Sequence, residues 1–199
     1  MDISTQAGPA RVELDRPATA TFLLVMTHGA GGGLDSKDLL AVRDAGLGLG
    51  GIVARVLQPY RVRGASAPGA PGRQDAAWLE IVAALRADSP GLPLVQGGRS
   101  NGARVACRTA TGAGARAVVA LAFPLHPPGR PDQSRAAELR EAGTDVLVVN
   151  GARDPFGIPD ERDASKVVVL PGETHALSKK PAAVGAAVGE WLAGVLSGR

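Results

Sequence analysis

The pentapeptide Gly98-Arg99-Ser100-Asn101-Gly102 has the form G-x-S-x-G. Apolar residues typical of a short buried strand precede it, and a helix-like segment begins at Ala103. This pattern at a strand-to-helix junction is typical of a nucleophile elbow, a sharp turn that exposes a serine hydroxyl. Glycines on both sides are needed because a Cβ there would collide with the neighbouring strand or helix. The sequence therefore predicts that Ser100 is a catalytic nucleophile.

A serine nucleophile needs a base, and the chain contains three histidines: His28, His126 and His175. Chains with this kind of elbow carry the serine, the acid and the histidine in that order, and His28 precedes Ser100. His175 follows the strand-like segment 166–170, and loops at the carboxyl ends of strands form the ligand crevice of open α/β sheets. We therefore expect His175 to be the base. His126 either borders the site or has a structural role, and we favour the structural role.

The acid is best sought in the segment after the strand predicted at 146–150. Asp154 lies there, and Pro155 stiffens its turn, which suits a carboxylate that orients the imidazole of His175. An ordinary Asp-Pro turn is the alternative interpretation. Three further acidic residues lie close by, in a polar run typical of a solvated surface: Asp160, Glu161 and Asp163. The order of residues along the chain favours Asp154.

A glycine-rich segment, His28-Gly29-Ala30-Gly31-Gly32-Gly33, follows the apolar strand predicted at 21–27. Such a loop could hold a phosphate, but it lacks the Gly-Lys-Ser/Thr ending of a Walker A loop. It also lacks the last glycine of a dinucleotide-binding fingerprint. A loop that donates a backbone N–H to an oxyanion fits better. We expect the amides of Ala30 and Asn101 to form the oxyanion hole and His28 to support the loop by hydrogen bonds.

The chain resembles α/β-hydrolases, in particular the small dienelactone-hydrolase-like serine hydrolases, a branch that includes a testis-expressed eukaryotic protein and a chromatin-complex subunit. Four segments carry the resemblance across most of the chain: 27–32, 97–104, 123–129 and 153–157. The family's usual Ser-Met-Gly-Gly-Arg differs here at Asn101, which places a polar side chain beside the oxyanion site, and at Ala103. True dienelactone hydrolases carry a cysteine nucleophile, so the resemblance implies no lactone hydrolysis by Ser100.

Strands and helices alternate along the chain, which predicts an α/β fold with a mostly parallel sheet covered on both faces. We expect strands at 10–14, 21–27, 52–58, 94–97, 117–122, 146–150 and 167–170. Apolar residues recur at helical spacing over 78–85 and 184–195, so Trp78 and Trp191 are expected in the core. A further helix is predicted between Leu34 and Leu49. Only about a dozen residues separate the strand at 117–122 from the next helix, so we expect no lid domain and a shallow, open site.

The composition is that of an ordinary globular chain, and we expect residues 1–199 to form one domain. The 22 basic and 19 acidic residues are interspersed and aromatic residues are few, which argues against nucleic-acid binding. The single cysteine, Cys107, excludes an intramolecular disulfide and is expected in the core. No Cys/His cluster has zinc-site spacing, and we expect no cofactor. With no visible secretory signal and no apolar run near ~20 residues, we expect a cytoplasmic protein that binds no membrane.

Together these residues predict a serine hydrolase that cleaves a small-molecule carboxylic ester or thioester through an acyl-enzyme. The alternative is a non-catalytic binding or scaffold protein on the same fold, because a fold does not fix a function. The intact serine, aspartate and histidine argue against that alternative. Amide hydrolysis would retain these residues, whereas an epoxide hydrolase would need an aspartate at the elbow. The Pro59–Gly72 segment, with a tyrosine and two arginines, either lines the substrate entrance or forms a solvated loop.

Overall fold

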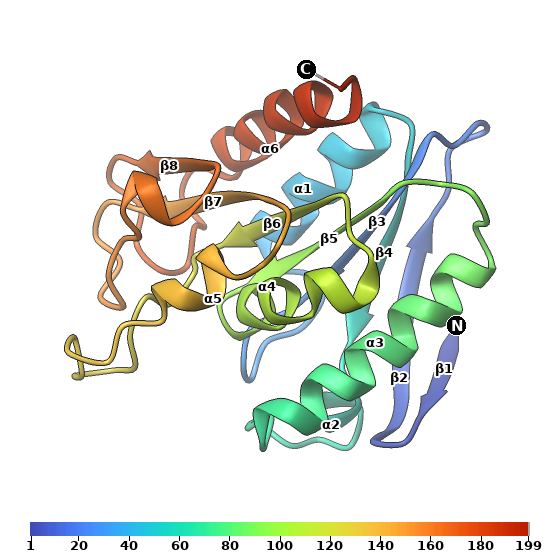
Figure 1. Ribbon diagram of the computed structural model, residues 1–199, viewed down its shortest axis with the longest axis horizontal. Coiled ribbons are helices and arrows are strands. Elements are labelled where there is room, and N and C mark those ends of the chain that lie inside the picture. Colours follow the sequence, from blue (N-terminus) through green and yellow to red (C-terminus); the bar gives the residue numbers. More distant parts are fainter. Residues whose placement is uncertain (199) are drawn as a thin grey trace.

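A computed structural model describes residues 1–198 and contains one eight-stranded sheet (Figure 1). The strand order is β1-β2-β4-β3-β5-β6-β7-β8. β2 pairs antiparallel with β1 and with β4, and all other neighbours are parallel. The strands are β1 Asp2–Thr5, β2 Gly8–Asp15, β3 Phe22–Thr27, β4 Gly51–Leu57, β5 Leu94–Arg99, β6 Ala117–Leu121, β7 Asp145–Gly151 and β8 Lys166–Leu170.

Helices cover both faces of this sheet (Figure 1). α1 and α6 lie together on one face, and α3 and α4 lie together on the other. The helices are α1 Lys37–Gly48, α2 Pro59–Val62, α3 Pro71–Ala87, α4 Asn101–Ala113, α5 Ala136–Arg140 and α6 Pro181–Leu196, with a short 3₁₀ helix, η1, at Glu161–Asp163. Parallel sheets need this cover because their strands are buried on both faces.

The residues of β3 show how the sheet divides the core into two layers. Phe22, Leu24 and Met26 pack with residues of α1 and α6. Leu23 and Val25 pack with residues of α3 instead. Successive side chains of a strand point to opposite faces, so an unbroken apolar run is what a strand between two helical layers requires. The layers hold the carboxyl ends of β3, β5, β7 and β8 in fixed relative positions.

The predicted α/β fold is confirmed, and each of the seven predicted strands agrees with the structure to within two residues at either end. β1 was not predicted, because only Ile3 of its four residues is buried. α2 and α5 were also missed, since four and five residues are too few to show a helical period. Trp78 is buried and Trp191 packs against the core. Cys107 is buried among core alanines, and burial raises the pKa of its thiol.

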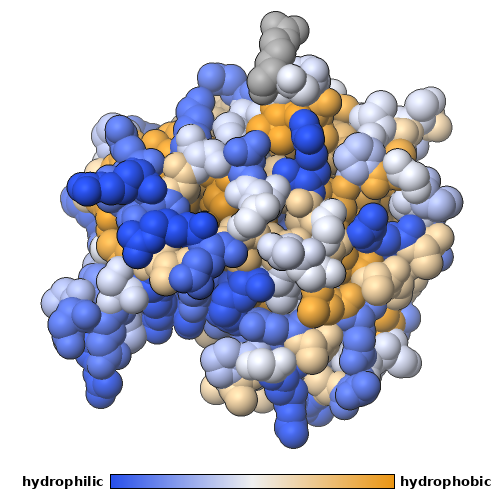
Figure 2. All heavy atoms as spheres, in the orientation of Figure 1, coloured by the Kyte–Doolittle hydropathy of each residue, from blue (hydrophilic) through white to orange (hydrophobic). Residues whose placement is uncertain are grey.

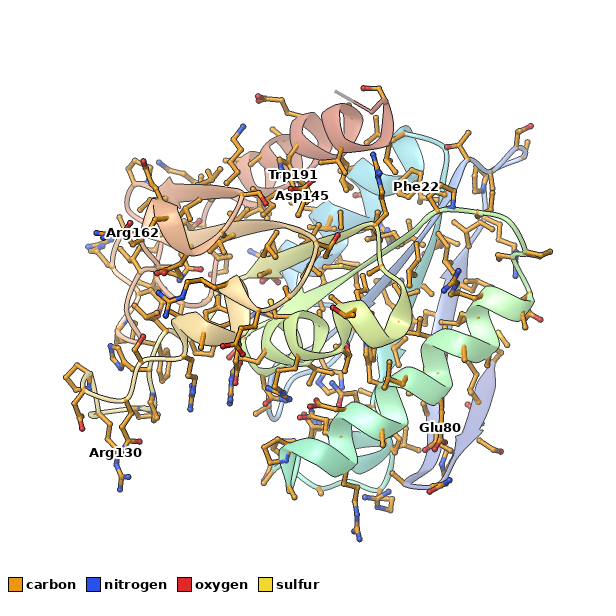
Figure 3. The ribbon with its side chains drawn as sticks, in the orientation of Figure 1. Phe22, Glu80, Arg130, Asp145, Arg162 and Trp191 are labelled. Atoms are coloured by element: carbon orange, nitrogen blue, oxygen red, sulfur yellow. The ribbon has the colours of Figure 1, made fainter. Side chains whose placement is uncertain are left out.

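No lid domain is present between β6 and β7. A loop and α5 alone connect these strands, and the loop projects from the body of the molecule (Figure 1). Arg130 lies near its outer end and points away from the sheet (Figure 3). In the part of the chain that the structure describes, no inserted domain therefore covers the carboxyl edge of the sheet.

Within residues 1–198, no helix combines the length and apolar character needed to cross a bilayer.

Candidate active site

The turn between β5 and α4 has the strained backbone of a nucleophile elbow. Ser100 has φ 52° and ψ −116°, in the positive-φ region that residues other than glycine rarely adopt. Its N–H donates to the carbonyl oxygen of Leu121 at 2.8 Å, which fastens the turn to the end of β6. Strain of this kind persists only where the surrounding structure enforces it, and it is typical of functional sites.

The two glycines of the G-x-S-x-G pattern are required by close backbone contacts. A Cβ on Gly98 would lie 2.7 Å from the carbonyl oxygen of Thr27. A Cβ on Gly102 would lie 2.6 Å from the carbonyl oxygen of His28. Neither contact can be relieved by a side-chain rotation, because both partners are backbone atoms. The steric reason predicted for these glycines is thus confirmed.

The structure brings Ser100, His175 and Asp154 together. Nε2 of His175 lies 2.9 Å from Oγ of Ser100. On the other side of the ring, Nδ1 lies 2.9 Å from Oδ2 of Asp154. An Nδ1–H donated to the carboxylate leaves the lone pair of Nε2 free to accept the serine hydroxyl proton. This is the arrangement that general-base activation of a serine requires.

Two of the other acidic candidates, Asp160 and Asp163, have different partners. Asp160 and Asp163 form a capping box around η1. Asp160 pairs with Arg162, and Asp163 lies 3.1 Å from Arg140. Neither residue has a hydrogen bond to His175 among residues 1–198. Asp154 is the acidic side chain that the structure places against the imidazole.

The carboxylate of Asp154 is buried and held from several sides. Its side chain has no exposed surface, and Oδ1 accepts the N–H of Phe156 at 2.9 Å. Nδ2 of Asn150 lies 3.4 Å from Oδ2 and donates to the carbonyl oxygen of Phe123 at 3.1 Å. The ring of Phe156 packs on the imidazole of His175, with centroids 4.4 Å apart. Asn150 was missed by the sequence reasoning, although a polar residue at the end of an apolar strand was visible.

The glycine-rich loop after β3 lies against the nucleophile. A Cβ on Gly29 would be 3.1 Å from Cβ of Ser100. Gly32 N–H donates to the carbonyl oxygen of Gly29 at 3.0 Å, and Gly31 takes the positive φ, 69°, that this turn needs. Among residues 1–198, no acceptor bonds the N–H of Ala30 or of Asn101. Two backbone donors, one on the loop beside Ser100 and one directly after it, are thus free of protein partners.

His28 supports this loop, as predicted. Its ring is buried, Nδ1 donates to the carbonyl oxygen of Gly29 at 2.8 Å, and Nε2 accepts the N–H of Gln58 at 3.0 Å. Burial lowers the pKa of His28 to about 4, so the ring is neutral at physiological pH. His126 has contacts of the structural kind expected of it. Its backbone N–H donates to the carbonyl oxygen of Phe156, and its ring lies against Gly157.

The beginning of the Pro59–Gly72 segment forms part of the scaffold. Tyr60 is only 5% exposed, and burial raises the pKa of its hydroxyl to about 12. Nε of Arg61 donates to the carbonyl oxygen of Gly32 at 2.9 Å. Residues 64–67 are exposed. α2 therefore packs behind the glycine-rich loop, and the solvated part of the segment begins after it.

A family model described as an alpha/beta hydrolase domain matches residues 20–178. The chain belongs to the α/β-hydrolase family. No match to a curated protein is found. The family assignment agrees with the sheet order, the strained serine turn and the uncovered carboxyl edge. It also confirms the superfamily resemblance seen in the sequence.

Several solved structures share the fold at low sequence identity. XC6422 from Xanthomonas campestris, described as a serine hydrolase without lid, is 19% identical with a TM-score of 0.75, over 97% of this chain and 92% of that one. Est1E from Butyrivibrio proteoclasticus is 16% identical with a TM-score of 0.81, over 99% and 98%. A dienelactone hydrolase from Anabaena variabilis is 20% identical with a TM-score of 0.78, over 97% and 95%. The narrower resemblance to the branch with a testis-expressed protein stays a prediction.

Proposed function

We propose that this α/β-hydrolase cleaves a carboxylic ester or thioester through an acyl-enzyme on Ser100. The observation that carries the proposal is the hydrogen-bonded chain from Ser100 through His175 to Asp154, with both contacts at 2.9 Å. A non-catalytic scaffold would have no use for a strained serine turn, since the strain costs on the order of 1–3 kcal/mol. The family assignment supports hydrolysis as the reaction class.

Acylation begins when Oγ of Ser100 attacks the substrate carbonyl carbon and its proton passes to Nε2 of His175. The carbonyl oxygen becomes an oxyanion, which accepts hydrogen bonds from the amides of Ala30 and Asn101. Asp154 stabilises the imidazolium through Nδ1–H. The tetrahedral intermediate then expels an alcohol or thiol, which takes the proton from Nε2, and the acyl group remains on the serine.

Deacylation repeats these steps with water as the nucleophile. His175 accepts a proton from water as the hydroxide attacks the acyl carbon, and the same two amides hold the second oxyanion. Collapse breaks the bond to Oγ, and the serine regains its proton from Nε2. One substrate molecule and one water are consumed, and a carboxylic acid and an alcohol or thiol are released.

The surroundings of the serine favour a small substrate with a short acyl group. Large hydrophobic residues are exposed at Met1 and Val169, and neither belongs to the segments that border Ser100. An apolar groove of about 650 Å³ lies between α1 and α6, but no residue of the proposed triad lines it. The surface around the loop that follows β6 is mostly hydrophilic (Figure 2). The bound ferulic acid in one Est1E structure supports a small-molecule substrate here.

A fluorophosphonate probe tests the nucleophile, because it labels serines that a base activates. The wild-type protein should be labelled, and Ser100→Ala should not. Ser66→Ala is a matched control, since Ser66 is exposed on the neighbouring 59–72 segment. Labelling that survives Ser100→Ala would overturn the proposal. A parallel screen of esters, acyl thioesters and anilides identifies the leaving group.

Two expectations from the sequence stay predictions: that residues 1–199 form one domain, and that the protein is cytoplasmic.

A further inference from the structure

Arg99, the residue before the proposed nucleophile, is folded back toward the histidine loop. Its Nη2 donates to the carbonyl oxygen of His175 at 2.7 Å. Its Nε donates to Oδ2 of Asp38 at 2.8 Å. The arginine side chain is 18% exposed and the aspartate side chain is fully buried. A charge-assisted pair in such a place is well ordered, and dissolved ions weaken it little because it is largely buried.

This one guanidinium joins three segments that meet at the site. Arg99 is the last residue of β5, directly before Ser100. Asp38 lies in the first turn of α1, the helix that follows the glycine-rich loop. His175 lies in the connection between β8 and α6. The guanidinium also lies beside Gly29, where a Cβ would be 3.5 Å from Nη1.

The triad contacts alone do not fix where the backbone of His175 lies. Ser100 and Asp154 contact the imidazole nitrogens, and a shift of the backbone would tilt the ring away from both. Arg99 binds the main chain of the same residue, and it is itself held by Asp38. Errors of about 1 Å in such a geometry can cost on the order of 10² in rate.

We infer that Arg99 is a positioning residue, which sets the backbone of His175 so that Nε2 meets the serine hydroxyl, and that Asp38 holds the guanidinium in place. The inference rests on the proposed function. A planar guanidinium suits the task, because it can donate to a carboxylate and to a carbonyl in different directions at once. A lysine ammonium in its place has no such fork.

The test uses Arg99→Lys and Arg99→Ala, with an ester that the wild-type enzyme hydrolyses. Arg99→Lys keeps a positive charge opposite Asp38, so we expect an unchanged melting temperature. We expect kcat to fall about 10- to 100-fold while KM changes less than about threefold, because the acyl and leaving groups do not touch Arg99. Millimolar guanidinium or ethylguanidinium should restore part of the lost kcat in Arg99→Ala, by filling the vacated site.

Arg153→Ala is the matched control. Nη2 of Arg153 donates to the carbonyl oxygen of Gly172 at 2.9 Å, in the same connection that carries His175, but it does not reach His175. We expect this variant to retain kcat and to show no response to guanidinium. Asp38→Asn should lower kcat less than Arg99→Ala does, because an amide oxygen can still accept from Nε.

The outcomes separate the two proposals. If the wild-type enzyme is labelled and active, and Arg99→Lys matches it in kcat, the role of Arg99 is wrong while the proposed function stands. An equal loss of kcat in Arg99→Ala and Arg153→Ala, without guanidinium rescue, would reduce Arg99 to a general support of the loop. A wild-type protein that is neither labelled nor active would instead contradict the proposed function itself.

Discussion

His28 and His175 occupy similar places in the fold but have opposite kinds of partners. Each follows a parallel strand, at the carboxyl edge of the sheet, and each uses both ring nitrogens. The partners of His28 are backbone groups, and its ring is fully buried. The partners of His175 are the side chains of Ser100 and Asp154, and its own side chain is 20% exposed.

This difference decides which histidine can do chemistry. Nε2 of His28 accepts an N–H whose proton belongs to a peptide group and cannot be given up. Nε2 of His175 accepts from a hydroxyl, which can lose its proton when its oxygen attacks a carbonyl. Burial also lowers the pKa of His28 to about 4, which opposes protonation of that ring. Position at the sheet edge is shared, so the partners of the ring determine its role.

The largest expected effect is the loss of the proposed base. His175→Gln should lower kcat by roughly 10⁵–10⁶, as removal of a triad histidine does in comparable serine enzymes. His28→Gln should retain activity within about tenfold and should lower the stability, because it breaks two buried hydrogen bonds. Ester hydrolysis and urea unfolding of both variants check the contrast. A catalytic loss in His28→Gln as large as in His175→Gln would end the distinction.

The next effect concerns the acid. Asp154→Asn should cut turnover by roughly 10⁴, because an amide at this position favours the wrong tautomer of His175. Asp160→Asn is the control, since Asp160 is exposed and pairs with Arg162. It should change turnover less than about threefold. If Asp160→Asn were the more damaging change while both melting temperatures stayed the same, the acid has been assigned wrongly.

The candidate site residues that the sequence predicted belong to a local motif or to a fixed chain order. Ser100 lies in a five-residue pattern, and Asp154 and His175 follow it in the expected order, each just past an apolar strand. Arg99 and Asn150 were missed. Arg99 binds partners 61 and 76 residues away, and no local pattern encodes such contacts. β1 was missed for a different reason: its partner β2 is close in sequence, but only Ile3 of its four residues is buried, so no apolar pattern marks the strand.

The acid stability of the protein should report the burial of His28. The unfolded chain protonates this residue near its ordinary pKa of 6.5, whereas the folded protein resists protonation down to about 4. The unfolded state therefore binds more protons between these pH values, and stability falls as pH falls through this window. The difference between the two pKa values corresponds to a loss of on the order of 3 kcal/mol in the free energy of unfolding. This loss is complete only below about pH 4.

Urea unfolding of the wild-type protein and His28→Gln from pH 7.5 to pH 4 measures this contribution, because the carboxylates common to both cancel in the difference. The wild-type protein should be the more stable at pH 7.5, and its advantage should shrink toward pH 4. An advantage that stays constant across this range would show that His28 titrates normally in the folded protein. The buried, backbone-bonded environment assigned to it would then be wrong.

The smallest expected effect tests the openness of the His175 region against the closed surroundings of His28. The loop that connects β6 with α5 forms no lid, and among residues 1–198 no large exposed apolar residue borders the serine. A long acyl chain therefore finds little apolar surface to contact. Full burial of each added methylene would contribute ~0.8 kcal/mol, nearly fourfold in affinity, and we do not expect that gain here.

We expect kcat/KM for p-nitrophenyl esters to peak at acetate or butyrate, with no activation on micelles. A steady fourfold rise per methylene out to long chains would contradict an open site. Such a result would imply an apolar groove beside Ser100. Substitutions in the exposed part of the Pro59–Gly72 segment would then locate the groove, because this part approaches Gly31 through Ser66.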